Sequence, residues 1–409
     1  MSIATLIGYL IGGRTAIFRI ASTPQAVWLG ALFVLGAGFA REYDRHDLTR
    51  EPWHLMVPFA ASLATSLLLF CLVYVVGRLW RTEAYPFWPS YRSFLSLYWM
   101  TAPLAWLYAI PVERFLSLGD ATRFNLAMLA IVSLWRVVLM ARVIEALFGA
   151  GRLQALWLVM LLADSVALLT LYLTPLPMIN IMGGIPLSES EELISGTAVF
   201  VGFAGILSWP VWLVGTITIF ATRWRSDLPS EIPQTTIDRK LWALAVLAIV
   251  GWLPILPMTQ SEQRLRYDVE SAMRDDRIAE AVEVMSAHDR GEFPPDWTPP
   301  PRLAYENPQP KVQDVLDVIA TRGAAPWVRE IYLEKLELIL NWVDDEEIDR
   351  MLTSLERIPE GLAFVRREVS YFSSAWQNEK NAVRKDRLRN LLKKAGHSVS
   401  DPETPVAGP

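Results

Sequence analysis

Two of the chain's four histidines lie in one segment, AREYDRHDLTREPWHL (residues 40–55), together with four carboxylates and three arginines. Carboxylate and imidazole groups are donors to divalent cations, which makes Asp44, His46, Asp47 and His54 candidate ligands, the last also a candidate proton carrier. On a helix, however, Asp44 and Asp47 would share a face that His46 does not, and the interleaved arginines would neutralise the carboxylates. The pattern therefore favours another interpretation, in which the segment is a short amphipathic connector at a membrane surface and holds no metal.

Four charged residues lie inside long apolar runs: Arg136, Arg142 and Glu145 in one run and Asp164 in the next. Two residues separate the runs, which predicts a tight antiparallel hairpin. At about 1.5 Å rise per residue, Arg136 and Asp164 would both lie roughly 20 Å from its apex and could pair. An unpaired charge at mid-bilayer costs roughly 3 kcal/mol on insertion scales, so a partner is expected. Arg142 and Glu145, three residues apart, can pair within one helix.

The Arg136 and Asp164 pair allows two interpretations. Ionisable residues at this depth commonly belong to a path for a substrate, an ion or a proton. They can equally act as a clamp that fixes the packing of the hairpin. Transporters often have broken helices at matching positions of two halves, and no such repeat is visible here. The pattern favours the clamp.

The elements that must position these residues are apolar helices. A hydrocarbon core of about 30 Å needs roughly 20 apolar residues in a helix, and seven stretches meet this requirement. They are residues 24–40, 53–77, 93–112, 124–150, 153–174, 193–221 and 240–257. Ahead of them, apolar residues between 3 and 11 recur at helical spacing, which predicts an interfacial amphipathic segment over residues 1–23. The predicted fold is all-α, with a polytopic transmembrane bundle over residues 24–258.

Charge density changes after the seventh stretch. Up to residue 257 the chain has 17 Lys and Arg against 15 Asp and Glu, and from residue 258 on it has 21 against 28. Residues 259–395 are expected to form a soluble domain of stacked helix hairpins. Its helices are expected at 262–275, 278–288, 312–321, 327–342, 346–357 and 381–394. The acidic balance argues against a nucleic-acid partner.

Two segments of this domain have their own signals. Seven prolines between residues 293 and 310 predict an extended strap, which fits a rigid linker better than a PxxP ligand. Residues 380–394 form a basic helix that could lie on anionic lipid or pack by its leucines against the acidic residues 344–349; the pattern favours the second. Residues 396–409 are expected to be disordered.

Lys and Arg are unevenly divided between the two sets of loops, with ten on one side of seven spans and five on the other. Because cytoplasmic loops are richer in these residues, the N-terminus is expected in the cytoplasm and residues 259–395 outside it, in a plasma (inner) membrane. Loss of one span would reverse the side of the C-terminal domain.

Common catalytic signatures are missing from the sequence, including a phosphate loop, an H-E-x-x-H pair, a C-x-x-C pair and a nucleophile elbow. No cofactor is therefore expected. Cys71 is the single cysteine, so no intramolecular disulfide can form.

Three stretches resemble a Yip1-type membrane domain: GGRTAIFRIASTPQAVWLGALFVLG (residues 12–36), YWMTAPLAWLYAIP (98–111) and LWRVVLMARVIEALFGAGRLQAL (134–156). The similarity covers residues 1–175. It implies a five-helix bundle with a cytoplasmic N-terminus and a non-enzymatic part in membrane organisation or trafficking. It supplies no functional residue, and the later part of the chain has no counterpart in that family.

These observations favour a non-enzymatic membrane scaffold, assembly or trafficking factor, embedded in a lipid bilayer, whose C-terminal helical domain binds a protein partner. Two alternatives stay open. One is a transporter or channel that uses Asp164 and Arg136. The other is a membrane enzyme that uses the carboxylates and histidines of residues 44–54.

Overall fold

The computed structural model describes residues 1–80, 86–174, 176, 187–220, 236–303 and 310–397. Within these ranges the chain is helical and contains no strand. It divides into two compact units, Met1–Pro177 with Ser188–Gln263 and Met178–Leu187 with Arg264–Pro409. The boundary falls inside helix α10 (Leu256–Arg274). Each unit has its own hydrophobic core.

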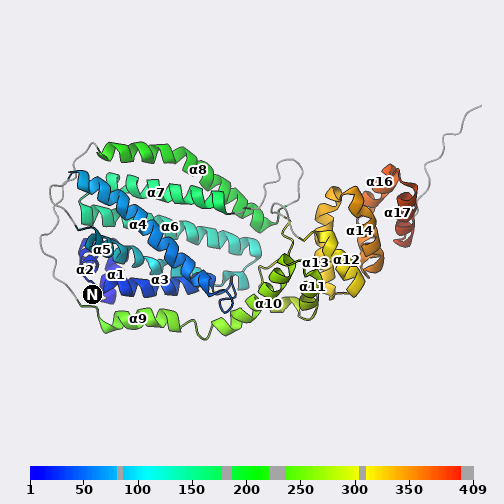
Figure 1. Cartoon of the computed structure of the whole chain (residues 1–409), viewed down its shortest axis with the longest axis horizontal. Helices are drawn as coiled ribbons and strands as arrows, with labels where there is room; N and C mark the ends of the chain where they lie inside the picture. The colour runs from blue at the N-terminus through cyan, green and yellow to red at the C-terminus, as the bar shows by residue number, and fades with distance from the viewer. Residues whose placement is uncertain (81–85, 175, 177–186, 221–235, 304–309, 398–409) are drawn as a thin grey trace, which may run out of the picture. The chain divides into compact units, whose positions relative to one another are not determined.

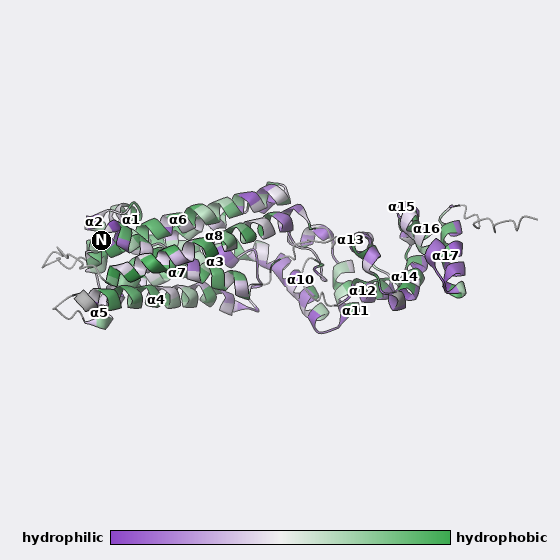
Figure 2. Cartoon of the chain, turned by 90° about the horizontal axis from the view of Figure 1, so that it is seen from above, coloured by the Kyte–Doolittle hydropathy of each residue, from purple (hydrophilic) through white to green (hydrophobic). Residues whose placement is uncertain are grey.

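The first unit is a bundle of long helices (Figure 1). In chain order its elements are α1 (Ile3–Leu10), α2 (Arg14–Ala21), α3 (Ala26–Glu42), η1 (Pro52–Leu55), α4 (Met56–Trp80), α5 (Phe87–Trp99), η2 (Ala102–Ala109), η3 (Val112–Arg114), α6 (Leu118–Phe148), α7 (Arg152–Leu173), α8 (Glu189–Phe220), α9 (Arg239–Val250) and the start of α10. Figure 2 shows that α4, α6, α7 and α8 carry mostly hydrophobic residues.

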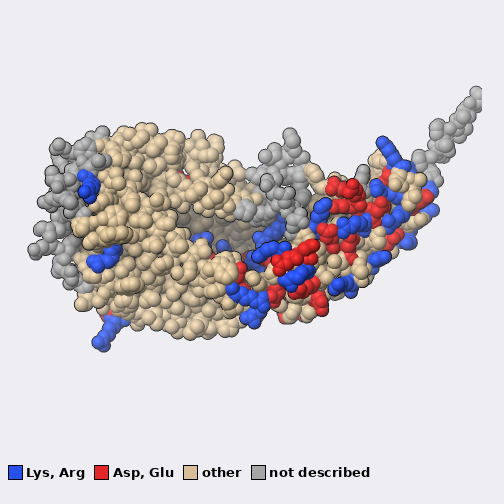
Figure 3. All heavy atoms as spheres, in the orientation of Figure 1, with Lys and Arg blue, Asp and Glu red and all other residues tan. Residues whose placement is uncertain are grey.

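Five segments of this unit are long and apolar enough to cross a membrane: Pro52–Arg78, Phe87–Arg114, Leu118–Phe148, Arg152–Leu173 and Glu189–Phe220. They correspond to five of the seven predicted stretches. Large apolar side chains on them are exposed; on α8, Phe200 and Phe203 are 71% and 65% exposed. Charged side chains are sparse on the face of the bundle seen in Figure 3. Exposed apolar surface of this extent fits contact with lipid, as in an integral membrane protein.

The remaining two predicted spans differ from expectation. Helix α3 has 17 residues and makes an angle of 105° with α2, and this bent pair would count as a sixth span. Helix α9 has 12 residues, about 18 Å, which is shorter than a hydrocarbon core of about 30 Å. The predicted span at 240–257 is not one helix, because Gly251 and Pro254 lie in the turn between α9 and α10 and proline disfavours helix before it. The count of seven spans is therefore not confirmed.

Helix α3 lies in the core of the bundle, where it packs against α4, α5, η2 and α9. Its residues Leu29 and Phe33 are fully buried. Gly30 faces α5, where an added Cβ would lie 2.8 Å from the Cβ of Trp99. Glycine permits this close approach of two backbones, as is common among membrane helices.

The segments that connect the helices of the first unit lie at the two ends of the bundle, where they contact one another. At one end the amide of Asp238 donates to the carbonyl of Met1 at 2.8 Å. At the other, Arg114 pairs with Glu262 at 2.8 Å, and Gln260 bonds to the backbone of residues 43–48. Helix α9 begins at the first end, and its chain reaches the second at the start of α10.

The N-terminal segment is helical as predicted, in two short pieces. Gly12 ends α1 with a φ of +80°, a left-handed conformation that favours glycine. Leu6 is buried in the bundle, whereas Ile7 and Ile11 are 56% and 75% exposed. One face of α1 therefore packs inward and the other presents apolar side chains outward.

The second unit consists of helix pairs. Its elements are the end of α10, α11 (Ile278–Ser286), η4 (Arg290–Glu292), α12 (Val312–Arg322), α13 (Pro326–Ile339), η5 (Leu340–Trp342), α14 (Asp345–Arg357), α15 (Gly361–Arg367), α16 (Val369–Asn378) and α17 (Ala382–Lys394). Three residues join the helices of each pair, α10 to α11, α12 to α13, α14 to α15 and α16 to α17. Charged side chains cover much of the visible surface of this unit (Figure 3). The predicted hairpins are present, and α15 and α16 are additional to the predicted helices.

The proline strap is non-helical over residues 293–303, and residues 304–309 lie outside the described ranges. It packs into the core of its unit and is not a free linker, because Phe293 and Trp297 are buried and stacked with ring centroids 4.8 Å apart. The hydroxyl of Tyr332 donates to the Pro300 carbonyl at 2.5 Å. Burial raises the pKa of Tyr332, so this hydroxyl stays protonated and able to donate.

Two further expectations concern the C-terminal end. Helix α17 complements the acidic start of α14, as predicted: Arg384 and Arg387 lie 3.1 and 3.7 Å from the carboxylate of Asp349. The predicted disordered tail, 396–409, falls outside the described residues from 398 on.

Candidate functional site

The intramembrane charges of α6 and α7 have separate partners. Asp164 accepts a hydrogen bond from Ser208 of α8 at 2.5 Å. The guanidinium of Arg136 lies over the ring of Tyr98 of α5, 5.4 Å from its centroid. No ion pair joins Arg136 to Asp164 among the described residues, so the predicted pairing is not formed. Equal depth in a hairpin places two residues at one level, but their directions around each helix decide which neighbours they meet.

The second predicted pair is formed. Arg142 and Glu145 lie 2.6 Å apart, three residues apart on α6. Arg152 approaches the other carboxylate oxygen at 3.3 Å, and the Nε of Arg142 donates to the Gly12 carbonyl at 3.3 Å. The group therefore joins the end of α6 to the start of α7 and to the turn between α1 and α2. This charged group therefore holds neighbouring elements of the bundle together.

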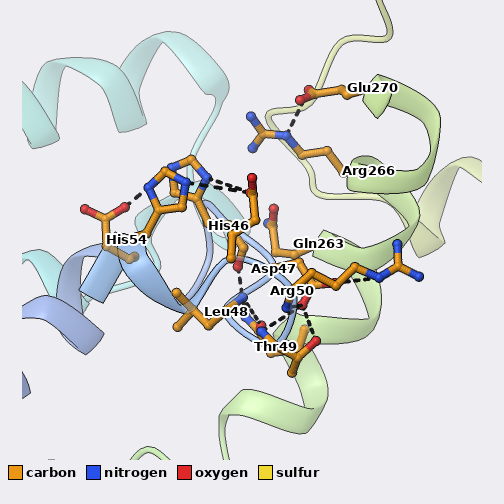
Figure 4. A network of polar contacts seen from close by, with 12 residues as sticks. His46, Asp47, Leu48, Thr49, Arg50, His54, Gln263, Arg266 and Glu270 are labelled. Atoms are coloured by element: carbon orange, nitrogen blue, oxygen red, sulfur yellow. Dashed lines mark hydrogen bonds and ion pairs between the residues drawn. The ribbon is translucent and has the colours of Figure 1, made fainter. Parts of the chain in front are cut away.

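The connector between α3 and η1, residues 43–51, has a fixed backbone. Asp47 is 1% exposed, and its carboxylate accepts from the amides of Thr49 and Arg50. Gln260 of α10 donates to the carbonyls of Tyr43 and His46, both at 3.1 Å, and accepts from the amide of Leu48 at 2.6 Å. Figure 4 shows Asp47 beside Leu48, Thr49 and Arg50 in this turn. Asp47 is thus a turn-forming residue, as aspartate side chains often are.

His46 of the connector and His54 of η1 lie face to face (Figure 4). The ring centroids of His46 and His54 are 3.6 Å apart and their planes differ by 9°. Two carboxylates adjoin them. The Glu42 carboxylate lies 3.6 Å from Nε2 of His46, and one oxygen of Glu51 lies 3.8 Å from Nδ1 of His46 and 3.7 Å from Nε2 of His54. We call these four residues the histidine cluster.

The structure therefore brings together half of the predicted ligand set. His46 and His54 meet, whereas Asp47 forms the turn and Asp44 presents its backbone carbonyl to Gln263. The carboxylates that do adjoin the imidazoles, Glu42 and Glu51, were not predicted. The spacing in the sequence could have predicted these contacts, because Glu42 precedes His46 by four residues and Glu51 precedes His54 by three, and residues so spaced are neighbours on a helix.

Donor atoms in the histidine cluster could hold a metal ion or protons. One atom each from Glu42, His46 and His54 can be chosen so that all three lie within 4.8 Å of one another. Glu42 is buried, and both imidazoles are half-buried. Imidazole and carboxylate together are the donors that zinc uses outside thiolate sites.

The chain matches no protein-family model, no curated protein and no solved structure. The Yip1-type resemblance of residues 1–175 therefore stays a prediction.

Proposed function

We propose that the chain is a non-enzymatic membrane scaffold or assembly factor. In this proposal the helical bundle anchors the chain in a lipid bilayer, and the C-terminal unit binds a protein partner. The observation that carries it is the row of helix pairs from α10 to α17, each joined by three residues. Stacked helix pairs expose extended surfaces that serve in many proteins for binding other proteins.

Contacts between neighbouring pairs keep this surface in one shape. Helix α12 packs against α11, α13 and α14, and α17 packs against α14 and α15. Arg350 of α14 reaches both Asp314 and Asp317 of α12, at 2.8 and 2.5 Å. Such a network preorganises a binding surface and lowers the ordering cost on association.

Two exposed apolar side chains mark where a partner would bind. Leu338 near the end of α13 and Trp342 in η5 are 41% and 56% exposed. Tryptophan is enriched among the residues that dominate binding energy at interfaces. Among the large apolar residues described in this unit, Val383 on α17 is also exposed.

Seven crossings remain our proposal for the bundle. Both α3 and the chain from α9 to α10 run between the ends that the five clear spans connect, which supports counting them as crossings. On that count of seven, the loops that the sequence assigns to the side of Met1 contain ten Lys and Arg. The positive-inside rule places that end in the cytoplasm and the C-terminal unit outside, with the plasma membrane as the proposed location.

Site-specific photo-crosslinking in intact cells tests the scaffold proposal. A photoreactive amino acid at Leu338 is expected to give a discrete protein adduct, and the same group at Asn390, exposed on α17, is expected to give none. Trp342→Ala should reduce the Leu338 adduct at least tenfold, because truncating a central aromatic anchor costs about 2 kcal/mol or more. The control, Val383→Ala, removes an apolar side chain that is 73% exposed on another helix and should leave the adduct unchanged. Absence of any adduct from exposed positions along α11–α17 would contradict the proposal.

Transport is a second candidate because of Asp164. This carboxylate lies midway along α7, in a candidate span, and its hydrogen-bond partner is a hydroxyl. Ionisable groups at such positions often carry protons or ions. Flux into liposomes that Asp164→Asn abolishes, with Ser208→Ala less affected, would favour transport over the scaffold.

A further inference from the structure

We propose that Glu42, His46 and His54 bind a divalent transition-metal ion of the zinc class, with Glu51 orienting the two imidazoles. The site lies at the connector between α3 and η1. It does not depend on the proposed scaffold function.

Distances in the histidine cluster fit ligands around a shared ion better than hydrogen bonds. Nε2 of His46 lies 3.6 Å from the Glu42 carboxylate, beyond the roughly 2.7–3.2 Å of a hydrogen bond. Neighbouring ligand atoms of a tetrahedral zinc ion, with bonds of about 2.0–2.2 Å, lie about 3.4 Å apart. A contraction of a few tenths of an ångström would bring Glu42 and His46 to that separation.

Glu51 is placed to select which nitrogen of each ring binds the ion. One of its oxygens faces Nδ1 of His46 and Nε2 of His54, at 3.8 and 3.7 Å. The opposite nitrogens, Nε2 of His46, which faces Glu42, and Nδ1 of His54, would then be the ones that bind the ion. Metal-binding histidines usually donate their second N–H to a carboxylate or carbonyl, which fixes the tautomer. At 3.7–3.8 Å the Glu51 oxygen adjoins both rings as an ion-pair partner, and it would have to move closer to accept a hydrogen bond from either.

Two arginines of the segment contact its carboxylates, and one of these carboxylates belongs to the proposed ligand Glu42. Arg41 approaches Oε1 of Glu42 at 3.4 Å, while the contact to His46 uses Oε2. Arg50 pairs with Asp47 at 3.8 Å. The carboxylate oxygen that faces His46 is therefore a different atom from the one beside Arg41.

Preorganisation of the connector favours binding. The three hydrogen bonds of Gln260 hold the backbone on both sides of His46. Pro52 begins η1, which carries His54.

The near-parallel imidazole rings must turn about their Cβ–Cγ bonds so that the lone pairs of their nitrogens converge on one ion. Three protein ligands would leave a fourth position for water or another small ligand, the arrangement of open zinc sites.

Cobalt(II) titration of the full-length chain in detergent, after removal of metal by a chelator, tests the proposal. We expect one Co²⁺ per chain with the intense visible bands of a four-coordinate ion, displaced by one equivalent of Zn²⁺. His46→Ala and His54→Ala should each abolish these bands. The matched controls, His288→Ala and His397→Ala, remove the other two histidines and should leave them unchanged. Glu51→Gln should keep the stoichiometry and weaken the affinity by about 10- to 100-fold, as loss of an orienting carboxylate does.

A wild-type titration without these bands, or bands that persist in both His46→Ala and His54→Ala, would overturn the site. Gel filtration of each variant reports whether it folds. If the alanine variants aggregate, Glu42→Gln replaces one ligand oxygen by an amide of the same shape. Undiminished Co²⁺ affinity in a monodisperse Glu42→Gln sample would also overturn the proposal.

Discussion

Lys335 provides a direct test of how the proline strap is held. Its side chain is 6% exposed, and its ammonium donates to the carbonyls of Pro299 and Pro301. Lys335→Met keeps most of the aliphatic stem and removes the charge and both donors. The two carbonyls would then lie in a largely buried environment without these donors.

The expected cost follows from these contacts. Hydrogen bonds to a charged group contribute about 1.5–3 kcal/mol each. Relief of the cost of burying the ammonium offsets part of this, which leaves about 2–4 kcal/mol. Since each 1.4 kcal/mol is tenfold, local opening of the strap should increase roughly 30- to 700-fold.

Hydrogen exchange on the full-length chain in detergent measures this opening. The reporter is the amide of Trp297, which donates to the Pro294 carbonyl at 3.1 Å. Amides of α4 serve as an internal reference, and Lys393→Met, which removes an exposed lysine of α17, is the control variant. Exchange at Trp297 that changes less than threefold in Lys335→Met would refute the reasoning, as would an equal effect of Lys393→Met.

Three further predictions concern other parts of the chain. Gln260→Ala should speed exchange of the Leu48 amide at least tenfold, because it removes that amide's acceptor; Ser261→Ala, one position along α10, should not. Gly30→Ala should lower the melting temperature in detergent, since overpacking costs about 1–3 kcal/mol, whereas Gly196→Ala, with no atom within 4 Å of its added Cβ, should not. The hydrogen bond from Arg329 lowers the pKa of Glu360, so its contribution to stability is present above the unfolded value of about 4.3 and is lost as the pH falls through the lowered folded value. Unfolding of Glu360→Gln should therefore depend less on pH below about 4.3 than unfolding of the wild type, and equal acid dependence would contradict this.

The long helices of the bundle could be predicted because each requires only a continuous apolar run. Five predicted stretches correspond to segments that meet the requirements for a span. Helix α3 was harder, because its glycines weaken the apolar signal while they permit close contacts, Gly30 with α5, Gly36 with α9 and Gly38 with η1. The stretch at 240–257 is not one helix, because composition averages over the turn at Gly251 that ends α9. Helix α15 has seven residues, too few for a periodic pattern to stand out.

Apart from the complementary charges of α17 and α14, side-chain partners were predicted only where they are close in sequence. Arg142 and Glu145 lie on one helix, so spacing sufficed. Arg136 instead meets Tyr98, and Asp164 meets Ser208, each on a different helix. The turn around Asp47 likewise depends on a helix more than 200 residues away in sequence, because Gln260 and Leu48 are separated by 212 positions.

That separation also has a consequence for biogenesis. The connector is synthesised with α3 and α4, yet the residue that holds its backbone appears 212 positions after Leu48. At about 5–20 residues per second, the ribosome needs roughly 10–40 s to cover that distance. During this interval residues 43–48 lack three of their hydrogen bonds, and the two imidazoles lack a fixed frame. The histidine cluster can therefore mature only after the last apolar helix of the bundle has been made, which makes its assembly a late marker of completed insertion.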